Sequence, residues 1–207
     1  MEKTKLSVLL VQDMVLFPNS EIRVECEDVK DRKMILEAEE GQDKLMLVIN
    51  PLIASSLDVS SFPNVGVVAK IKLKMDVPNG KTRLVLEGIK RVEILNYYNE
   101  DDTYYADVID KISERHEDEN SYLSILKKAL ENYINSTPYM SNAILSQITS
   151  VTDLDNLCDL IATFLPFGYE KKKRYILELD PISRTKLLIE DMNEDLKIIK
   201  LEKSIEE

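Results

Sequence analysis

The sequence predicts an α+β protein with a β-rich first half and a helical second half. In the first half, apolar and charged residues alternate along several runs, a period typical of strands with one buried face. In the second half, apolar residues recur every three or four positions, as on one face of a helix. A charged run without apolar residues, 114–120, separates the two halves. We therefore expect domains at 1–113 and 121–207, joined by a linker at 114–120.

The β-rich half is expected to contain several strands and one helix. The expected strands cover 6–11, 22–26, 45–49, 67–77, 82–95 and 104–108. The turn signal Phe17-Pro18-Asn19-Ser20 separates the first two strands. Between 28 and 40 the period changes to that of a helix, and Gly41 suits the position just past a helix end. The serine-rich residues 52–64 are expected to form a loop.

The segment from Val65 to Leu95 carries the clearest strand signal. Apolar side chains occupy every odd position from Val67 to Val77, so we expect one dry and one wet face along this whole strand. Asn79-Gly80 can adopt the positive φ values that a tight reversal needs. Gly88 then interrupts the returning strand, as a bulge or a sharp corner would.

The helical half is expected to form a bundle that ends in a long helix. Apolar stripes predict helices within 122–134, 154–165, 170–179 and from 181 towards the end, with a weaker pattern at 139–149. Asp180-Pro181 is a strong start signal, because a capping residue precedes proline at the first helical position. The last helix has a thin apolar stripe, which is typical of a helix that projects or meets a partner.

Charge and cysteine content limit the classes of function. The chain carries 27 basic and 38 acidic residues, a net charge of −11, which argues against a nucleic-acid-binding surface. Cys26 and Cys158 lie far apart in apolar patterns, so we expect small buried residues and no disulfide framework or metal site. No apolar run approaches the roughly 18 residues that span a membrane. We expect a cytoplasmic protein with no membrane partner.

No catalytic, cofactor-binding or metal-binding residue is expected. His116 is the single histidine and lies in the charged run, where an exposed and idle side chain is the favoured interpretation. Gly80-Lys81-Thr82 lacks the upstream glycine of a phosphate-binding loop. No serine lies in the small-residue context that exposes a nucleophile. The chain alone is therefore predicted not to be an enzyme.

Two surface patterns have both a functional and a structural interpretation. Tyr97-Tyr98 and Tyr104-Tyr105 would suit an aromatic patch for protein segments, but cross-strand packing is the favoured interpretation. A basic row on one strand face would suit phosphates: Lys70, Lys72 and Lys74. Acidic residues on the returning strand and the acidic balance of the chain favour a solvated sheet face instead.

Five stretches occur in a fairly specific order and spacing. They are 9–18, which contains Phe17-Pro18, and 65–71, 78–91, 160–166 and 177–184. Together they resemble the N-terminal domain of Lon-type ATP-dependent proteases. The chain has Leu9-Leu10-Val11-Gln12 where the family usually opens with Leu-Pro-Leu-Arg, and Glu25-Cys26-Glu27 where a Gly-Arg pair usually follows the second strand. These departures indicate a divergent member.

The resemblance implies a fold and a role. Residues 1–113 would form a partly closed β barrel of the pseudouridine-synthase-and-archaeosine-transglycosylase-like (PUA-like) type, and 121–207 the helical bundle. The role would be non-catalytic: substrate binding in proteolysis and protein quality control, with unfolded, misfolded or tagged proteins as partners. The helices would help hexamers assemble. No cofactor is implied, since the family's ATPase and Ser-Lys peptidase domains would follow the last helix as further partners if the chain is a fragment.

Substrate contact needs apolar surface outside the core. The first candidates are apolar side chains near turns: Met14, Phe17, Phe62, Tyr97 and Tyr98. Two alternatives stay open. One is a stand-alone oligomerisation or adaptor module that forms a homo-oligomer through the last helix, and the other is a PUA-like RNA-binding protein, which the net charge disfavours.

Overall fold

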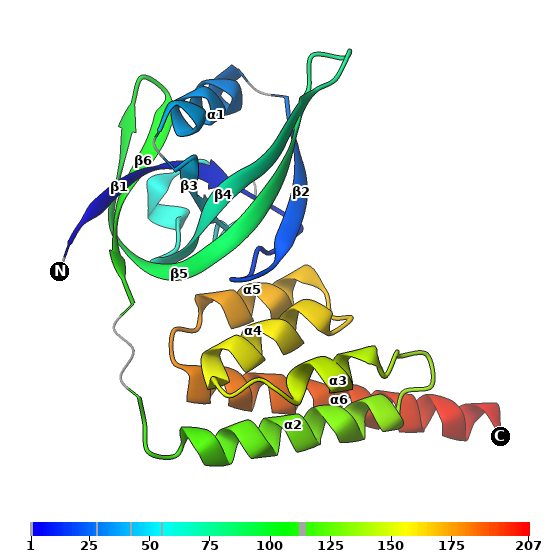
Figure 1. The fold of residues 1–207 in the computed structure, drawn as a ribbon. Coiled ribbons are helices and arrows are strands. Elements are labelled where there is room, and N and C mark those ends of the chain that lie inside the picture. The colour runs from blue at the N-terminus through cyan, green and yellow to red at the C-terminus, as the bar shows by residue number, and fades with distance from the viewer. Residues whose placement is uncertain (1, 28, 42, 55, 112–114) are drawn as a thin grey trace. The chain divides into compact units, whose positions relative to one another are not determined.

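The structure divides into two compact units. A computed structural model describes residues 2–27, 29–41, 43–54, 56–111 and 115–207 (Figure 1). We call residues 1–112 with 167–177 the strand unit, and residues 113–166 with 178–207 the helix unit. Each unit has its own contacts and is described by itself.

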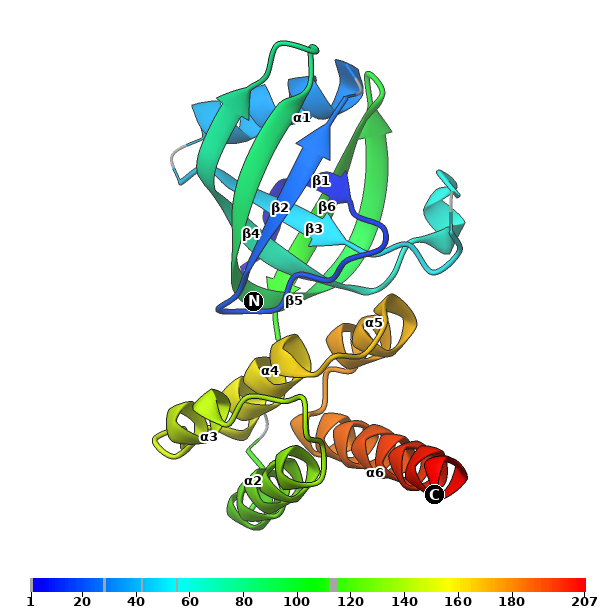
Figure 2. The same cartoon turned by 90° about the vertical axis from the view of Figure 1, so that its right-hand side faces the viewer.

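The strand unit is a partly closed β barrel, and the predicted α+β class is confirmed. Its strands in the described residues are β1 (Thr4–Leu10), β2 (Glu21–Cys26), β3 (Leu45–Ile49), β4 (Val65–Asp76), β5 (Thr82–Glu100) and β6 (Thr103–Asp110). They form one sheet in the order β2-β5-β4-β3-β1-β6, and a further pairing of β5 with β6 closes it (Figure 2). The long β5 makes this closure because its first half pairs with β2 and its second half with β6.

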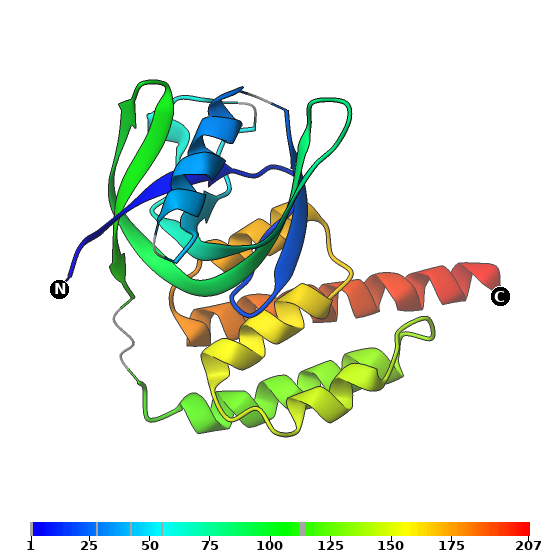
Figure 3. The same ribbon diagram turned by 45° about the horizontal axis from the view of Figure 1, so that its top comes forward.

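The barrel interior is filled by the inward side chains of its strands. The core residues include Val8, Leu47, Ile49, Phe62, Val68, Val92, Ile94, Ala106 and Val108. Helix α1 (Val29–Glu40) covers one end of the barrel and contacts β1, β3 and β6 (Figure 3). The buried side chains of α1 are Met34, Ile35 and Ala38. The predicted start of this helix at Asp28 lies outside the described residues.

The prediction of one dry face along the whole of β4 is wrong beyond Ile71. Val67, Ala69 and Ile71 are buried, whereas Leu73 and Met75 are 53% and 51% exposed. The pairing of β4 with β5 shifts register between Ile71 and Leu73. Because a bulge inserts one residue, it turns all later side chains to the opposite face of the strand. The apolar residues after the bulge therefore point outward.

The predicted interruption at Gly88 is confirmed. A second register shift in the pairing of β4 with β5 lies directly after Gly88, where Ile89 is the extra residue. Its backbone N–H donates to the carbonyl of Ser20 at 2.9 Å, and its carbonyl accepts from Asn19 N–H at 2.9 Å. A Cβ at Gly88 would lie 2.3 Å from the carbonyl oxygen of Phe17. Glycine is needed here because the Phe17–Ser20 turn lies directly against the sheet.

Helix α5 (Tyr169–Leu177) belongs to the strand unit. Arg91 on β5 is buried and donates from Nε to the carbonyl of Ile176 at 2.9 Å and from a terminal nitrogen to that of Tyr175 at 3.4 Å. Carbonyls at the end of a helix lack intrahelical partners and attract cations. The apolar stripe at 170–179 predicts a helix of the helical half, whereas α5 groups with the strands. Whether the two domains fold at the predicted boundaries stays a prediction.

The helix unit is a bundle around the long last helix. Its helices in the described residues are α2 (Glu119–Asn135), α3 (Ala143–Ile148), α4 (Leu154–Phe164) and α6 (Pro181–Glu206). Helix α6 contacts both α2 and α4. As predicted, Asp180 caps α6: its carboxylate accepts from the backbone N–H groups of Ile182 and Ser183. None of the helices in the described segments has the length and hydropathy that a membrane crossing would need.

The expected linker at 114–120 is partly helical. Helix α2 begins at Glu119, inside the charged run. The predicted boundary at Ser113 and the first linker residue, Glu114, lie outside the described residues.

Candidate functional site

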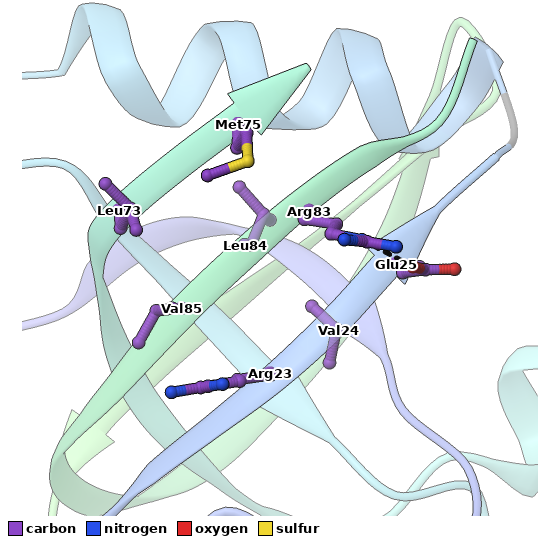
Figure 4. A pocket seen from close by; sticks show the side chains of 8 residues that line it. All are labelled: Arg23, Val24, Glu25, Leu73, Met75, Arg83, Leu84 and Val85. Carbon is purple, nitrogen blue, oxygen red and sulfur yellow. Dashed lines mark hydrogen bonds and ion pairs between the residues drawn. The ribbon is translucent and has the colours of Figure 1, made fainter. Parts of the chain in front are cut away.

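An open hollow of about 530 Å³ lies on the outer face of the sheet, over β2, β4 and β5 (Figure 4). We call it the sheet hollow. Its lining residues are Arg23, Val24, Glu25, Leu73, Met75, Arg83, Leu84 and Val85. Two rows of paired residues cross the three strands: Arg23–Val85–Leu73 and Glu25–Arg83–Met75. The register of the sheet thus places apolar and charged side chains next to one another on one face.

The apolar part of the sheet hollow comes from the bulge in β4. Leu73 and Met75 are each about half exposed, and Val85 beside them is half-buried. These side chains stand on paired strands, so their backbone positions are fixed by the sheet. Apolar groups held in water on a rigid surface can bury area against a partner without first reorganising.

The charged part of the sheet hollow is unequally paired. The Nε of Arg83 donates to the Glu25 carboxylate at 2.7 Å, and this bond with the Arg83 charge holds the pKa of Glu25 below its usual value. Arg23 is exposed and makes no hydrogen bond or ion pair within the described part of the chain. Two guanidiniums and one carboxylate give the lining a net charge of +1, whereas the whole chain carries −11.

A second apolar surface lies on the loop between β3 and β4. We call its residues 52–59 the apolar loop, and its exposed side chains are Leu52, Ile53, Leu57 and Val59. Phe62 anchors the loop, since its ring meets those of Tyr97 and Tyr104 edge-on at 5.2 Å each. The Tyr104 hydroxyl also donates to the carbonyl of Leu57 at 2.8 Å. The predicted loop is therefore fastened to the barrel at its end, although its Ser55 lies outside the described residues.

The other tyrosine pair supports the structural interpretation. Tyr98 and Tyr105 are opposite each other on β5 and β6, with stacked rings 6.2 Å apart. Their hydroxyls donate to Asp107 and Glu37. Burial, aided by these carboxylates, raises the pKa of each tyrosine to about 12. Cross-strand packing is confirmed, and the hydroxyls bind protein groups.

The five predicted contact residues lie in different environments. Phe17 and Phe62 are buried, at 1% and 5% exposed, whereas Met14 is 37% exposed. Tyr97 and Tyr98 are half-buried on β5. The structure brings Phe62 and Tyr97 together, but Met14 lies beside Asn50, whose amide donates to the Met14 carbonyl at 2.8 Å. Their role in substrate contact stays a prediction.

Sequence reasoning missed the residues of both apolar surfaces. The alternation along β4 assigned Leu73 and Met75 to the core, and no residue before them marks the bulge. The apolar loop did carry a signal, because aliphatic residues inside a serine-rich loop have no strand or helix to bury them. That signal would have pointed to Ile53 and Leu57, which are each 63% exposed.

Lys72 and Lys74 have carboxylate partners, and both cysteine thiols are protonated at neutral pH. The bulge breaks the predicted basic row, because Lys74 pairs with the buried Leu84 and lies on the opposite face from Lys70. Lys72 pairs with Glu21, and Lys74 lies 3.1 Å from a carboxylate oxygen of Glu39. Both cysteines are buried as predicted, and burial raises their pKa values to about 11 for Cys26 and about 12 for Cys158. Over the described ranges, no three histidine, cysteine or acidic side chains gather as metal ligands do.

Comparisons of the sequence and of the fold with known proteins point to the same family. The model of a family described as "ATP-dependent protease La (LON) substrate-binding domain" matches residues 5–194. A Lon protease of Brevibacillus choshinensis is 23% identical over 206 residues, covering 98% of this chain and 26% of that protein. A Lon protease of Bacillus thuringiensis is 30% identical over 146 residues, covering 69% of this chain and 18% of that protein. The chain thus spans about a quarter of these relatives' length or less.

Two solved structures share the fold. The N-terminal domain of a Mycobacterium avium complex Lon protease matches with a TM-score of 0.76 at 20% identity, over 92% of this chain and 98% of that one. A Lon N-terminal domain protein from Xanthomonas campestris matches with a TM-score of 0.61 at 15% identity, over 90% and 97% of the two chains. The likeness covers both the barrel and the helices.

Proposed function

Because this chain belongs to the family of substrate-binding domains of the ATP-dependent protease La (Lon), we propose that it recognises unfolded or tagged proteins for such a protease. In this role the chain binds and holds a polypeptide and performs no chemistry on it. Peptide hydrolysis and ATP turnover would belong to other domains of the parent protease, which are its proposed partners, in the cytoplasm.

One observation carries the proposal: the strand unit keeps apolar side chains in water on backbone that is already folded. Leu73 and Met75 in the sheet hollow and Ile53 and Leu57 on the apolar loop are each more than half exposed. Unfolded proteins differ from folded ones in displaying apolar side chains, and burial gains roughly 25 cal/mol per Å² of apolar surface. Such surfaces therefore favour unfolded over folded partners.

The state of the reactive side chains supports a binding role. The Cys158 thiol has a pKa raised by burial to about 12, so it is protonated at neutral pH and is a poor nucleophile. His116 is exposed, with Nε2 3.8 Å from the Asp180 carboxylate. Binding of unfolded protein requires no group of this kind.

A contribution to assembly is the second candidate function. Helix α6 exposes Ile198, Leu201 and Ile205 in its last turns, at 47%, 63% and 82%. Exposed aliphatic residues on a long helix suit contact with a second helix. Sedimentation of the chain and of a variant with serine at these three exposed positions tests this, and an unchanged oligomeric state would remove the idea. RNA binding is not proposed, because carboxylates already pair Lys72 and Lys74.

The direct test is binding of the 207-residue chain to a permanently unfolded protein. We expect labelled casein to bind, with fluorescence anisotropy as the readout, and folded lysozyme of the same label density to bind more weakly. Because the interaction is apolar, added salt should not abolish casein binding. Absence of casein binding at high micromolar chain concentration would contradict the proposal.

A further inference from the structure

We propose that the sheet hollow binds an extended polypeptide segment in which apolar residues lie beside a carboxylate. This inference rests on the proposed function. It adds to it a location, the outer face of β2, β4 and β5, and a substrate class, acidic apolar segments in extended conformation.

The spacing of the apolar side chains fits an extended chain. Leu73 and Met75 are two residues apart on one strand, which corresponds to about 6.5–7 Å. The side chains on one face of any extended peptide repeat at the same distance, so successive apolar residues of a ligand can meet both. Val85, in the next strand, widens this surface by one strand spacing, about 4.8 Å.

The charge of the sheet hollow selects an acidic ligand. Arg23 stands in the same row as Val85 and Leu73, without a described partner. An apolar ligand that covered this guanidinium would remove it from water, which costs free energy unless a carboxylate replaces the water. A guanidinium can bind both oxygens of a carboxylate at once, so Arg23 supplies geometry as well as charge.

The neighbouring cations do not compete with Arg23 for this carboxylate. Lys72 is paired with Glu21, and Lys81 lies 2.6 Å from a Glu27 oxygen. Arg83 is partly engaged by Glu25 but has donors besides Nε, and it stands next to Met75 in the second row. Two guanidiniums therefore border the apolar side chains of the sheet hollow, on a chain whose overall charge is negative.

The apolar loop gives a useful contrast. Its exposed side chains are aliphatic, and no arginine or lysine lies between 52 and 59. The one charged residue in this range is the exposed Asp58, so a ligand held there would gain nothing from a negative charge. Preference for a negative charge therefore reports on the sheet hollow and separates it from the other apolar surface of the same unit.

The experiment uses two short dye-labelled peptides and the full chain. In both peptides leucine or phenylalanine alternates with serine, and two of the serines are replaced by glutamate in one peptide and by lysine in its twin. We expect the glutamate peptide to bind about fivefold to tenfold more tightly by fluorescence anisotropy at low salt. This preference should shrink as salt screens the exposed charges.

Two variants locate the site. Arg23→Glu should reverse the preference, so that the lysine peptide becomes the tighter ligand. Leu73→Ser combined with Met75→Ser should weaken both peptides about tenfold, equivalent to about 1.4 kcal/mol. The matched controls are Leu95→Ser, at a residue 52% exposed on β5 outside the hollow, and Lys128→Glu, an equal charge change on α2. Both controls should bind as the unmodified chain does.

The outcomes distinguish this inference from the proposed function. If the chain binds casein and the peptides, but neither hollow variant changes peptide binding, the sheet hollow is not the site and the proposed function still stands. Failure of the unmodified chain to bind casein or either peptide would overturn both. A change of sedimentation in the hollow variants, with peptide affinities unaltered, would assign the surface to a second copy of the chain and overturn the polypeptide ligand.

Discussion

The sheet hollow of the strand unit and the Arg184 cluster of the helix unit place apolar and charged side chains in opposite ways. The strand unit leaves Leu73 and Met75 half exposed, whereas the helix unit buries Arg184 completely. Arg184 donates to Asp155 at 2.6 Å and to the carbonyl of Glu178 at 2.7 Å. Apolar side chains in water contribute little to stability, but they can bind a partner. A buried charge is not accessible to a partner, and it is stable only where the surrounding groups pair it. An exposed apolar surface is therefore available for contact, whereas a buried charge stabilises one arrangement of the helices around it.

Other polar groups of the helix unit follow the same rule. Tyr133 on α2 is buried and donates to Asp195 on α6. Burial, aided by this carboxylate, raises the pKa of the tyrosine above its ordinary value. Thr185 on α6 donates to the carbonyl of Pro181 at 2.8 Å and lies 3.3 Å from the Cys158 sulfur. Each of these contacts fixes α6 against a neighbouring helix or against its own first turn.

The largest expected effect is on the buried charge. Arg184→Met should lower the free energy of unfolding by about 3–5 kcal/mol, because Asp159, 3% exposed and 3.6 Å away, loses its cation inside the bundle. Urea unfolding followed by circular dichroism measures this. Arg184→Lys keeps the charge but not the planar fork, so it should lose less. A loss below about 1 kcal/mol for the methionine variant would contradict the idea that this buried charge stabilises the helix unit.

The next largest effect is expected at Gly88, where the strand unit has no space for a side chain. Gly88→Ala should cost about 1–3 kcal/mol, because the added Cβ would lie 2.3 Å from the Phe17 carbonyl oxygen and must displace the turn or the strand. Gly168→Ala is the matched control, since a Cβ there meets nothing within 4 Å. Thermal unfolding of both variants gives the readout. Equal melting temperatures would show that the turn moves away freely.

A smaller effect concerns the cap of α6. Asp180→Ala should cost about 1 kcal/mol at neutral pH, since two backbone N–H groups lose their acceptor. Burial alone would raise the pKa of Asp180, but hydrogen bonds from Ser183 and Ile182 lower it below the ordinary 3.8. The ionised cap therefore stabilises the folded state fully above pH 3.8, and this contribution is lost as the pH falls through the lower folded value.

The pH dependence supplies the control for this prediction. Asp180→Asn keeps a capping oxygen that does not ionise, so it should match the unmodified chain more closely than alanine at neutral pH. The difference between the aspartate and alanine chains should narrow in acid. A gap in unfolding free energy that stays constant from pH 7 to pH 3 would exclude the ionised cap as its source.

The smallest expected effect is on the exposed apolar pair. Leu73→Ser with Met75→Ser should change the free energy of unfolding by no more than about 0.5 kcal/mol for each residue, because neither side chain is part of the core. Leu86→Ala, on the buried face of β5 and outside the sheet hollow, should instead cost about 2–5 kcal/mol. Urea unfolding of the two variants compares the faces of one sheet. A large loss from the serine pair would mean that these residues serve the fold.

Much of the fold follows from periodicity, and its departures have local causes. The alternation along β4 correctly buries Val67 and Ile71, but one inserted residue then reverses the faces, and a bulge needs no special residue type. The cap at Asp180-Pro181 is chemically specific and was predictable from two residues. The position of α5 was not predictable. The apolar face of a short helix indicates that the helix packs against something, but it does not identify the neighbouring element.

The candidate site was less predictable than the fold. A residue near a turn can point inward or outward, and Phe17 and Phe62 point into the core while Met14 is partly exposed. The charge selection proposed for the sheet hollow depends on which cations have partners. Arg23 and Lys72 look alike in the sequence, but the sheet pairs Lys72 with Glu21 and leaves Arg23 open. Such differences depend on the side chains of neighbouring strands, so the sequence of one strand alone does not show them.

The position of α5 has a consequence for how the chain is made. The strand unit consists of 1–112 and 167–177, so its sequence is interrupted by 54 residues of the helix unit, 113–166. On a ribosome, the barrel strands emerge long before the carbonyls of Tyr175 and Ile176 that accept from Arg91 exist. Strands β1 to β6 all precede α2, α3 and α4 in the chain, and of the elements described in the strand unit only α5 is synthesised after these helices. A nascent chain halted at residue 112 would therefore contain all of these strands, but the buried Arg91 guanidinium would not yet have these two acceptors.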